Sequence, residues 1–147
     1  MAAPGADESI EESPVGWVAE HVRRYLATDG AEGAEFNGYD ALLVTTRGRR
    51  SGKLRRTALI YGRDGDRVLL VASNGGAAAH PNWYLNLSAD PEVEIQIGAE
   101  RFRGRARTAS GQERARLWEL MTKVFPPYAE YQRKTAREIP VVVVERA

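Results

Sequence analysis

Hydrophobic positions along this chain are spaced first as in a helix and later as in strands. Between residues 14 and 28 they recur every three or four positions among charged side chains, which predicts an amphipathic helix. Residues 1–14 are rich in Ala, Gly, Ser and acidic residues and have little to bury, so a disordered tail is expected there. Residues 29–38 carry three glycines and predict a connector.

Short runs rich in β-branched residues follow at 41–46, 56–62 and 67–73, and they predict strands. The last two runs are joined by residues 63–66, whose Asp-Gly pair favours a tight hairpin. A helix is expected over 81–89, because it begins with a proline, which is favoured at the first helical position.

Residues 92–108 show the clearest alternation in the chain. With a two-residue turn at Gly98-Ala99, the predicted hairpin register pairs Ile95 with Phe102, Val93 with Gly104, Glu94 with Arg103 and Glu92 with Arg105. Alternating arginines could form a nucleic-acid-binding strip. Their oppositely charged cross-strand partners favour the solvent-facing side of a hairpin instead.

The remaining segments predict two helices and a final strand. A capping-box pattern at Ser110 and Glu113 starts a helix that continues to about Val124. A shorter helix is expected over 128–137 and a buried strand over 140–145. About six mainly antiparallel strands with three to four packed helices indicate a mostly β, α+β barrel in one domain over residues 15–147.

Composition narrows the possible chemistry. The chain has 147 residues, no cysteine and two histidines, so thiol chemistry is excluded and no metal site is expected. No apolar run approaches the roughly 20 residues of a membrane span, and the N-terminus lacks a signal pattern, so a cytoplasmic protein is expected. A net charge of +1 argues against a nucleic-acid partner.

The segment Thr46–Arg56 concentrates basic residues between two predicted strands. Six of the 21 Lys and Arg residues fall within ten positions here, together with two glycines and hydroxyl side chains. Glycine lets backbone N–H groups approach an anion, and arginine binds phosphate or carboxylate with two hydrogen bonds. The segment is therefore a candidate phosphate cradle, although it lacks the P-loop spacing and a solvated basic turn is the alternative.

Two further segments could complete a site. Residues 71–81 leave a strand through Gly75-Gly76 and enter a helix, an arrangement whose exposed N–H groups can bind phosphate or line a planar ring. Phe125, Tyr128 and Tyr131 form an aromatic cluster whose two hydroxyls could donate to a substrate. An ordinary loop and simple aromatic packing remain the respective alternatives.

In this order, the three segments resemble the deazaflavin-dependent nitroreductase and quinone reductase family of actinobacteria. The resemblance covers residues 39 to 147 and is carried by 42–53, Arg55, 71–77, 81–87, Asp90-Pro91 and the C-terminal Ile-Pro-Val-Val-Val-Val. It implies a split β-barrel related to FMN-binding barrels, an F-420 type deazaflavin cofactor, and a small-molecule hydride acceptor such as a quinone, a nitroaromatic compound or another electron-poor ring.

The same resemblance implies roles for particular residues. The implied cofactor-binding residues are Arg49, Arg50, Ser51, Gly52, Lys53, Arg55, Arg56, Thr57, Val71, Ala72, Ser73, Asn74, Gly75, Gly76, Ala77, Pro81, Asn82, Trp83 and Asn86. The implied substrate pocket consists of Ile60, Phe125, Tyr128 and Tyr131. Tyr128, Tyr131 and Ser73 are the candidate catalytic residues.

Three positions depart from the pattern of some quinone- and nitroimidazole-reducing members. Phe125 replaces the first tyrosine of a three-tyrosine cluster, Ile60 replaces an aromatic residue, and Asn74 replaces a lysine. The expected cofactor binding survives these changes, but the basis for expecting activity on nitroimidazole prodrugs is weakened.

Three alternatives stay open. The barrel could bind FMN as a flavin oxidoreductase, or it could bind deazaflavin without catalysing a reaction. The N-terminal helix, with Trp17, His21, Arg23 and Arg24, either rests on an anionic membrane surface or packs over the barrel mouth, which is favoured because its apolar face is narrow. The chain is expected to be a monomer or a homodimer.

Overall fold

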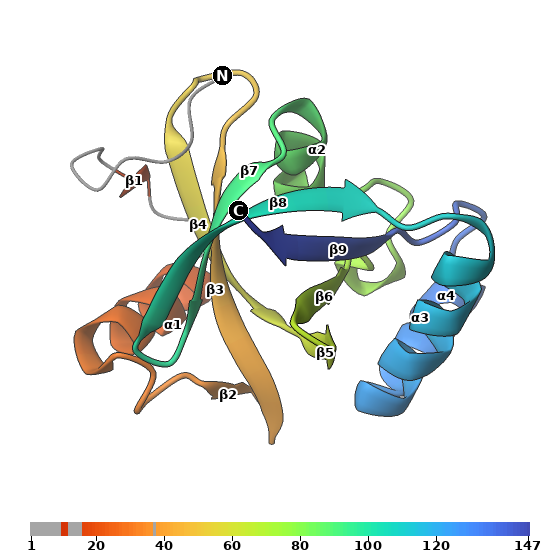
Figure 1. Ribbon diagram of the computed structural model, residues 1–147, viewed down its shortest axis with the longest axis horizontal. Helices are drawn as coiled ribbons and strands as arrows, with labels where there is room; N and C mark the ends of the chain where they lie inside the picture. The colour runs from red at the N-terminus through yellow and green to blue at the C-terminus, as the bar shows by residue number, and fades with distance from the viewer. Residues whose placement is uncertain (1–9, 12–15, 37) are drawn as a thin grey trace.

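A computed structural model describes residues 10–11, 16–36 and 38–147. Its strands are β1 (Ile10–Glu11), β2 (Glu35–Phe36), β3 (Tyr39–Arg47), β4 (Leu54–Ile60), β5 (Gly62–Asp64), β6 (Arg67–Val71), β7 (Glu92–Ile97), β8 (Glu100–Thr108) and β9 (Val141–Arg146). They form one sheet in the order β1-β4-β3-β7-β8-β9-β6-β5, with β2 paired to β3 (Figure 1). Every pairing is antiparallel except that of β1 with β4.

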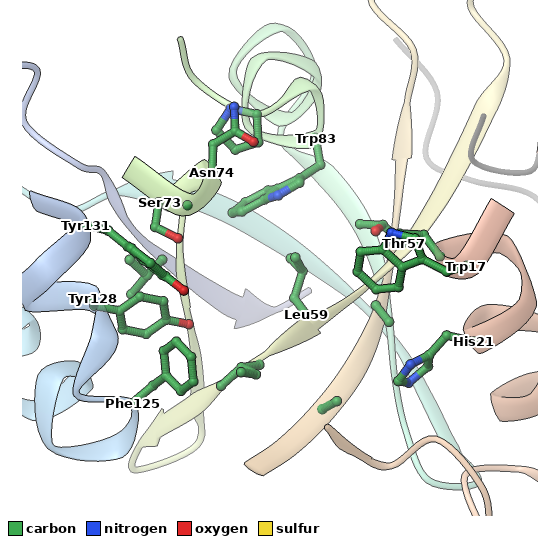
Figure 2. Close-up of a pocket in the computed structure, with 17 residues that line it drawn as sticks. Trp17, His21, Thr57, Leu59, Ser73, Asn74, Trp83, Phe125, Tyr128 and Tyr131 are labelled. Carbon is green, nitrogen blue, oxygen red and sulfur yellow. The ribbon is translucent and has the colours of Figure 1, made fainter. Parts of the chain in front are cut away.

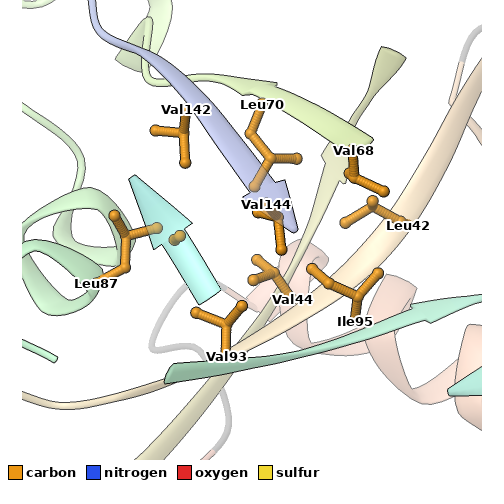
Figure 3. Packing of buried hydrophobic residues seen from close by; sticks show 10 residues of the cluster. Leu42, Val44, Val68, Leu70, Leu87, Val93, Ile95, Val142 and Val144 are labelled. Carbon is orange, nitrogen blue, oxygen red and sulfur yellow. The ribbon is translucent and has the colours of Figure 1, made fainter. Parts of the chain in front are cut away.

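The sheet curls around a buried apolar core, which confirms the predicted split β-barrel class. Leu42 of β3, Val68 of β6 and Ile95 of β7 all belong to one buried cluster, although β3 and β6 are far apart in the strand order (Figure 3). Burial of these β-branched and leucine side chains on the concave face is the main force that closes the barrel.

The last strand is buried on both faces, which explains its run of four valines. Val142 and Val144 point into the barrel core, whereas Val141 and Val143 belong to a second cluster on the other side. The second cluster is covered by α3 (Gly111–Val124) and α4 (Pro127–Arg133), which lie together at one end of the molecule (Figure 1).

Two other helices cover the barrel from different sides. Helix α1 (Gly16–Thr28) packs through Val22 and Tyr25 on Leu43 of β3, and α2 (Asn82–Ala89) contributes Leu87 to the barrel core. A 3-10 turn, η1 (Asn74–Gly76), lies between β6 and α2. Within the described ranges, no helix is both long and apolar enough to cross a membrane.

The predicted hairpin register is confirmed pair by pair. Ile95 lies opposite Phe102, and Glu92 opposite Arg105, whose Nη1 is 2.7 Å from the Glu92 carboxylate. Glu94 lies opposite Arg103 as predicted. Its carboxylate, however, contacts Arg56 of β4, across the intervening strand β3.

Some predicted boundaries were wrong. The tail over residues 1–14 is described only at Ile10–Glu11, where it forms β1 rather than a disordered segment; its other residues lie outside the described ranges. The predicted helix over 128–137 ends at Arg133, because the Gln132 side chain bonds the backbone of Arg137 and Ile139 and turns the chain. Short strands such as β1 and β2 carry too few residues for an alternation, so six strands were predicted where the described residues form nine.

Candidate functional site

The basic segment forms the turn between β3 and β4. The N–H of Gly48 donates to the Lys53 carbonyl, and the N–H of Gly52 donates to the Gly48 carbonyl, both at 2.8 Å. A side chain at position 48 would place its Cβ 2.9 Å from the Ser51 Oγ and 3.1 Å from the Lys53 carbonyl oxygen, so this tight turn favours glycine there. Gly52 has a φ of 73°, which also favours glycine.

The turn and α2 enclose a small polar cavity of about 200 Å³. Its lining residues are Gly48, Arg49, Arg50, Ser51, Arg55, Asn82 and Asn86. Arg49 is held in place by α2, because its Nη1 donates to the Asn86 Oδ1 at 2.9 Å and its Nη2 to the Asn82 Oδ1 at 3.4 Å. Three guanidinium groups around one small cavity form a site suited to an anion with several negative charges.

Two of the predicted basic residues lie outside this cavity. The guanidinium of Arg56 donates to Thr45 Oγ1 at 2.9 Å and lies 3.5 Å from the Glu94 carboxylate. Burial lowers the pKa of Arg56, which the Glu94 charge opposes. The strand alternation of β4 puts Arg56 on the face opposite Arg55, so its predicted cofactor contact is not supported by its position. Lys53 is exposed at the turn and is not among the lining residues.

A second, larger cavity has a volume of about 520 Å³, and Figure 2 shows residues that line it. The structure brings together here the predicted residues Thr57, Ile60, Val71, Ser73, Asn74, Gly75, Pro81, Trp83, Phe125, Tyr128 and Tyr131. Ala72, Gly76 and Ala77 belong to the same loop but are not part of the lining. The predicted substrate residues and part of the predicted cofactor residues therefore line one cavity, which has room for a planar ring and an acceptor.

We infer that the two cavities are neighbouring parts of one groove, because their lining residues are neighbours on β4 and on α2. Arg55 lines the polar cavity and Thr57 the larger one, and these residues are two apart on the same face of β4. Likewise Asn82 and Trp83, adjacent at the start of α2, line the polar and the larger cavity respectively. The groove thus has a cationic end and a mainly apolar end.

The aromatic cluster forms one wall of the larger cavity. The ring centroids of Phe125 and Tyr128 are 4.8 Å apart, and those of Tyr128 and Tyr131 are 6.4 Å apart. Figure 2 shows both hydroxyls pointing toward the middle of the cavity, with Leu59 and Trp83 facing them. Burial, helped by the neighbouring Tyr131, raises the pKa of Tyr128 far above its ordinary value, so its hydroxyl stays protonated and able to donate.

The loop that carries Ser73 and Asn74 packs tightly against this aromatic wall. Asn74, Gly75 and Gly76 all have positive φ angles, of 48°, 63° and 83°. A Cβ on Gly76 would lie 2.8 Å from the Tyr131 carbonyl oxygen, whereas one on Gly75 would meet open space. Glycine at position 76 is therefore what allows the loop to approach α4 closely.

Helix α1 contributes residues that the sequence did not place in the site. Trp17 and His21 line the larger cavity opposite the tyrosines (Figure 2), and Val18 of the same helix also lines it. His21 is oriented by a 2.8 Å hydrogen bond between its Nε2 and the Gly33 carbonyl, while Trp17 is 64% exposed. Helix α1 packs on Leu43 of β3, and its packing over the barrel mouth stays a prediction. No local pattern in the sequence indicates which of its residues reach the cavity.

The chain is similar to proteins of known family over most of its length. Residues 17–146 match the family described as F420H(2)-dependent quinone reductase. The chain is 41% identical over 130 residues to an F420H(2)-dependent quinone reductase of Mycobacterium tuberculosis, covering 86% of this chain and 87% of that relative.

Two solved structures share both sequence and fold with this chain. One, described as a domain-swapped dimer, has 41% identity and a TM-score of 0.70 over 90% of this chain and 100% of its own. The other, an F420-H2 dependent reductase (FDR-A), has 43% identity and a TM-score of 0.67 over 71% of this chain and 93% of its own.

Proposed function

Because the chain belongs to the F420H(2)-dependent quinone reductase family, we propose that it transfers a hydride from reduced coenzyme F-420 to an electron-poor acceptor such as a quinone. Nitroaromatic and unsaturated ring compounds are further acceptors of the same electronic type. The observation that carries the proposal is the pair of cavities, one lined by arginines and the other mainly apolar and lined by Tyr131 and by Tyr128, whose raised pKa keeps its hydroxyl protonated.

The residues of the cationic end fit the phosphate and acidic tail of this cofactor. Arg49, Arg50 and Arg55 supply charge, and Ser51 adds a neutral donor. Gly48 leaves the backbone open where a Cβ would fill the turn. A tail with several negative charges suits this cluster better than a single phosphate, which favours the deazaflavin over FMN.

The larger cavity fits a planar ring together with an acceptor. The bound deazaflavin supplies a hydride, so this chain has to align donor and acceptor and to exclude water. Trp83 provides a flat aromatic surface and Leu59 further apolar surface, and Ser73 and Asn74 border the cavity from the loop between β6 and α2.

The two tyrosines are placed to donate a hydrogen bond or a proton to the acceptor. A quinone oxygen gains negative charge as the ring accepts a hydride, and a donor hydroxyl nearby stabilises that charge. Tyr128 and Tyr131 direct their hydroxyls into the cavity, and the raised pKa of Tyr128 keeps its proton in place at neutral pH. These two donors favour an enzyme over a protein that only stores the cofactor.

A fluorescence titration of the purified chain with coenzyme F-420 and, separately, with FMN tests the cofactor assignment. We expect the deazaflavin to bind much more tightly than FMN and the reduced form to be oxidised when menadione is added. Tight binding of FMN alone would instead identify a flavin oxidoreductase. Deazaflavin binding without turnover of menadione would instead indicate a protein that binds the cofactor without catalysing a reaction.

Contact with a membrane surface and placement in the cytoplasm belong to the same proposal. Trp17 is exposed at the cavity mouth on α1, near the basic Arg24, and a lipid-dissolved quinone would approach from that side. Sedimentation with anionic vesicles, compared between the unaltered chain and Trp17→Ala, tests peripheral contact. Equal sedimentation of both chains would reject a role for this helix.

Size-exclusion chromatography decides between monomer and homodimer.

A further inference from the structure

Arg137, in the segment between α4 and β9, lies behind the loop that borders the larger cavity. Its Nη2 donates to the Ser73 carbonyl at 2.7 Å, its Nε to the Ala77 carbonyl at 2.9 Å, and its Nη1 to the Ala72 carbonyl at 3.2 Å. Nη1 is also 2.9 Å from Nδ1 of His80. Because arginine can only donate, His80 must accept through an unprotonated Nδ1.

The planar guanidinium of Arg137 thus hydrogen-bonds to both ends of the loop, at residues 72–73 and at His80, and to its middle at Ala77. In a trans peptide the N–H points opposite to the C=O, and the described residues contain no cis peptide. Carbonyls turned toward Arg137 therefore turn the N–H groups of Ser73 and Asn74 the other way. Arg137, which does not line the cavity, thus helps to orient two peptide planes next to it, together with the Gly76 N–H, which donates to the Ser73 carbonyl at 2.9 Å.

Arg137 is itself held by the end of the tyrosine helix. Its backbone N–H donates to Thr135 Oγ1 at 3.3 Å, and its carbonyl accepts from Gln132 Nε2 at 2.8 Å. Gln132 belongs to α4, which also carries Tyr128 and Tyr131. The guanidinium consequently connects the loop to the helix that presents the tyrosine hydroxyls.

The geometry points to Arg137 as a positioning residue that sets the loop carrying Ser73 and Asn74 relative to the tyrosine helix. Four hydrogen bonds of its guanidinium end on uncharged acceptors, so the contact is not an ion pair that any cation could replace. Lysine lacks the planar fork that reaches several carbonyls at once. The effect on catalysis rests on the proposed function, whereas the effect on the loop does not.

Hydrogen exchange of Arg137→Ala tests the structural part. We expect amide exchange over residues 72–79 to rise about tenfold or more, in keeping with the loss of hydrogen bonds to a charged group, while the strands β7 and β8 stay protected. Arg133→Ala is the matched control, because Arg133 is an exposed arginine on α4 that pairs with Glu130. Unchanged exchange over 72–79, or an equal rise throughout the barrel, would overturn the inference.

Binding and turnover of the same variants test the functional part. For Arg137→Ala we expect the dissociation constant for coenzyme F-420 to rise about tenfold and kcat with menadione to fall, with both partly restored by millimolar methylguanidinium. For Arg137→Lys we expect a dissociation constant and a kcat between those of the unaltered chain and Arg137→Ala. Arg137→Lys replaces Arg137→Ala in these tests if the alanine variant does not fold. If the unaltered chain binds no deazaflavin, the proposed function fails while the exchange result still decides the role of Arg137. If exchange over 72–79 rises but affinity and turnover stay unchanged, Arg137 has a structural role only.

Discussion

The backbone N–H and the Nη1 of Arg49 both donate to one atom, the side-chain Oδ1 of Asn86, at 3.2 and 2.9 Å. Asn86 is buried on α2, so this double contact anchors the basic turn to the helix that borders both cavities. Asn86→Ala should leave a part-buried N–H without its acceptor, at a cost of about 1–3 kcal/mol. It should also weaken coenzyme F-420 binding about tenfold in a fluorescence titration, because Arg49 loses its orientation.

Asn82→Ala provides the comparison for Asn86. Its Oδ1 accepts from Arg49 at 3.4 Å, and the residue is exposed, so a smaller loss of affinity is expected. An Asn82→Ala variant that binds less well than Asn86→Ala would contradict this order.

Adjacent arginines on β4 should behave oppositely. Arg55→Gln removes a cation from the polar cavity and should lower cofactor affinity about tenfold or more. Arg56→Gln should leave affinity nearly unchanged but lower stability to urea, because the part-buried Glu94 loses its partner. Equal losses of affinity in both variants would mean that the groove extends around the strand to Arg56.

The cavity hydroxyls should affect turnover rather than cofactor binding. Tyr128→Phe and Tyr131→Phe each retain the ring packing and remove one donor, so kcat with menadione should fall on the order of tenfold to a hundredfold. Tyr39→Phe is the control, since Tyr39 packs edge-on against Phe125 but does not line the cavity. Since the pKa of Tyr128 is raised, turnover should show no loss from its ionisation up to pH 10.

Neighbouring glycines in the loop should differ in their tolerance of alanine. Both have positive φ angles, so Gly75→Ala should cost about 1–2 kcal/mol from backbone strain alone. Gly76→Ala adds an overlap with the Tyr131 carbonyl and should cost a further ~1–3 kcal/mol. Urea denaturation of the two variants measures the difference. If both lose the same stability, the loop does not depend on close contact with α4.

An ion-pair network beside α3 should make the fold sensitive to acid. Arg116 and Arg67 lower the pKa of Asp64 from 3.8 to about 2, and Arg107 lowers that of Glu113 from 4.5 to about 2. A depressed folded-state pKa stabilises the protein above the unfolded value, and this stability is lost as pH falls through the folded value. Thermal stability should therefore decrease between about pH 4.5 and pH 2.

Arg67→Gln should flatten this decrease, because Arg67 contacts both carboxylates. Lys123→Gln is the control, as Lys123 forms an exposed pair with Glu119 at 3.7 Å. Thermal melting at several pH values compares the three chains. A decrease that remains as steep in Arg67→Gln would assign the acid sensitivity to other groups.

Much of the barrel could be predicted because its signals are local. Alternation over 92–108 was enough for the register of β7 and β8, since a shift of one residue would turn Val93 and Ile95 to the solvent. The Asp-Gly pair marked the β5–β6 hairpin for a similar reason. The same alternation also separates Arg56 from Arg55, because consecutive residues of β4 lie on opposite faces of the sheet.

By itself, the sequence determined the strands with clear alternation, the basic turn with its two glycines, and the loop and tyrosines that line the cavity. Only the tertiary structure decided that α1 brings Trp17 and His21 opposite those tyrosines, and that Arg137 holds the loop from behind. The physical reason is distance along the chain. Spacing within one element reports which face a residue occupies, but contacts between residues 60 positions apart depend on how the closed sheet packs its helices.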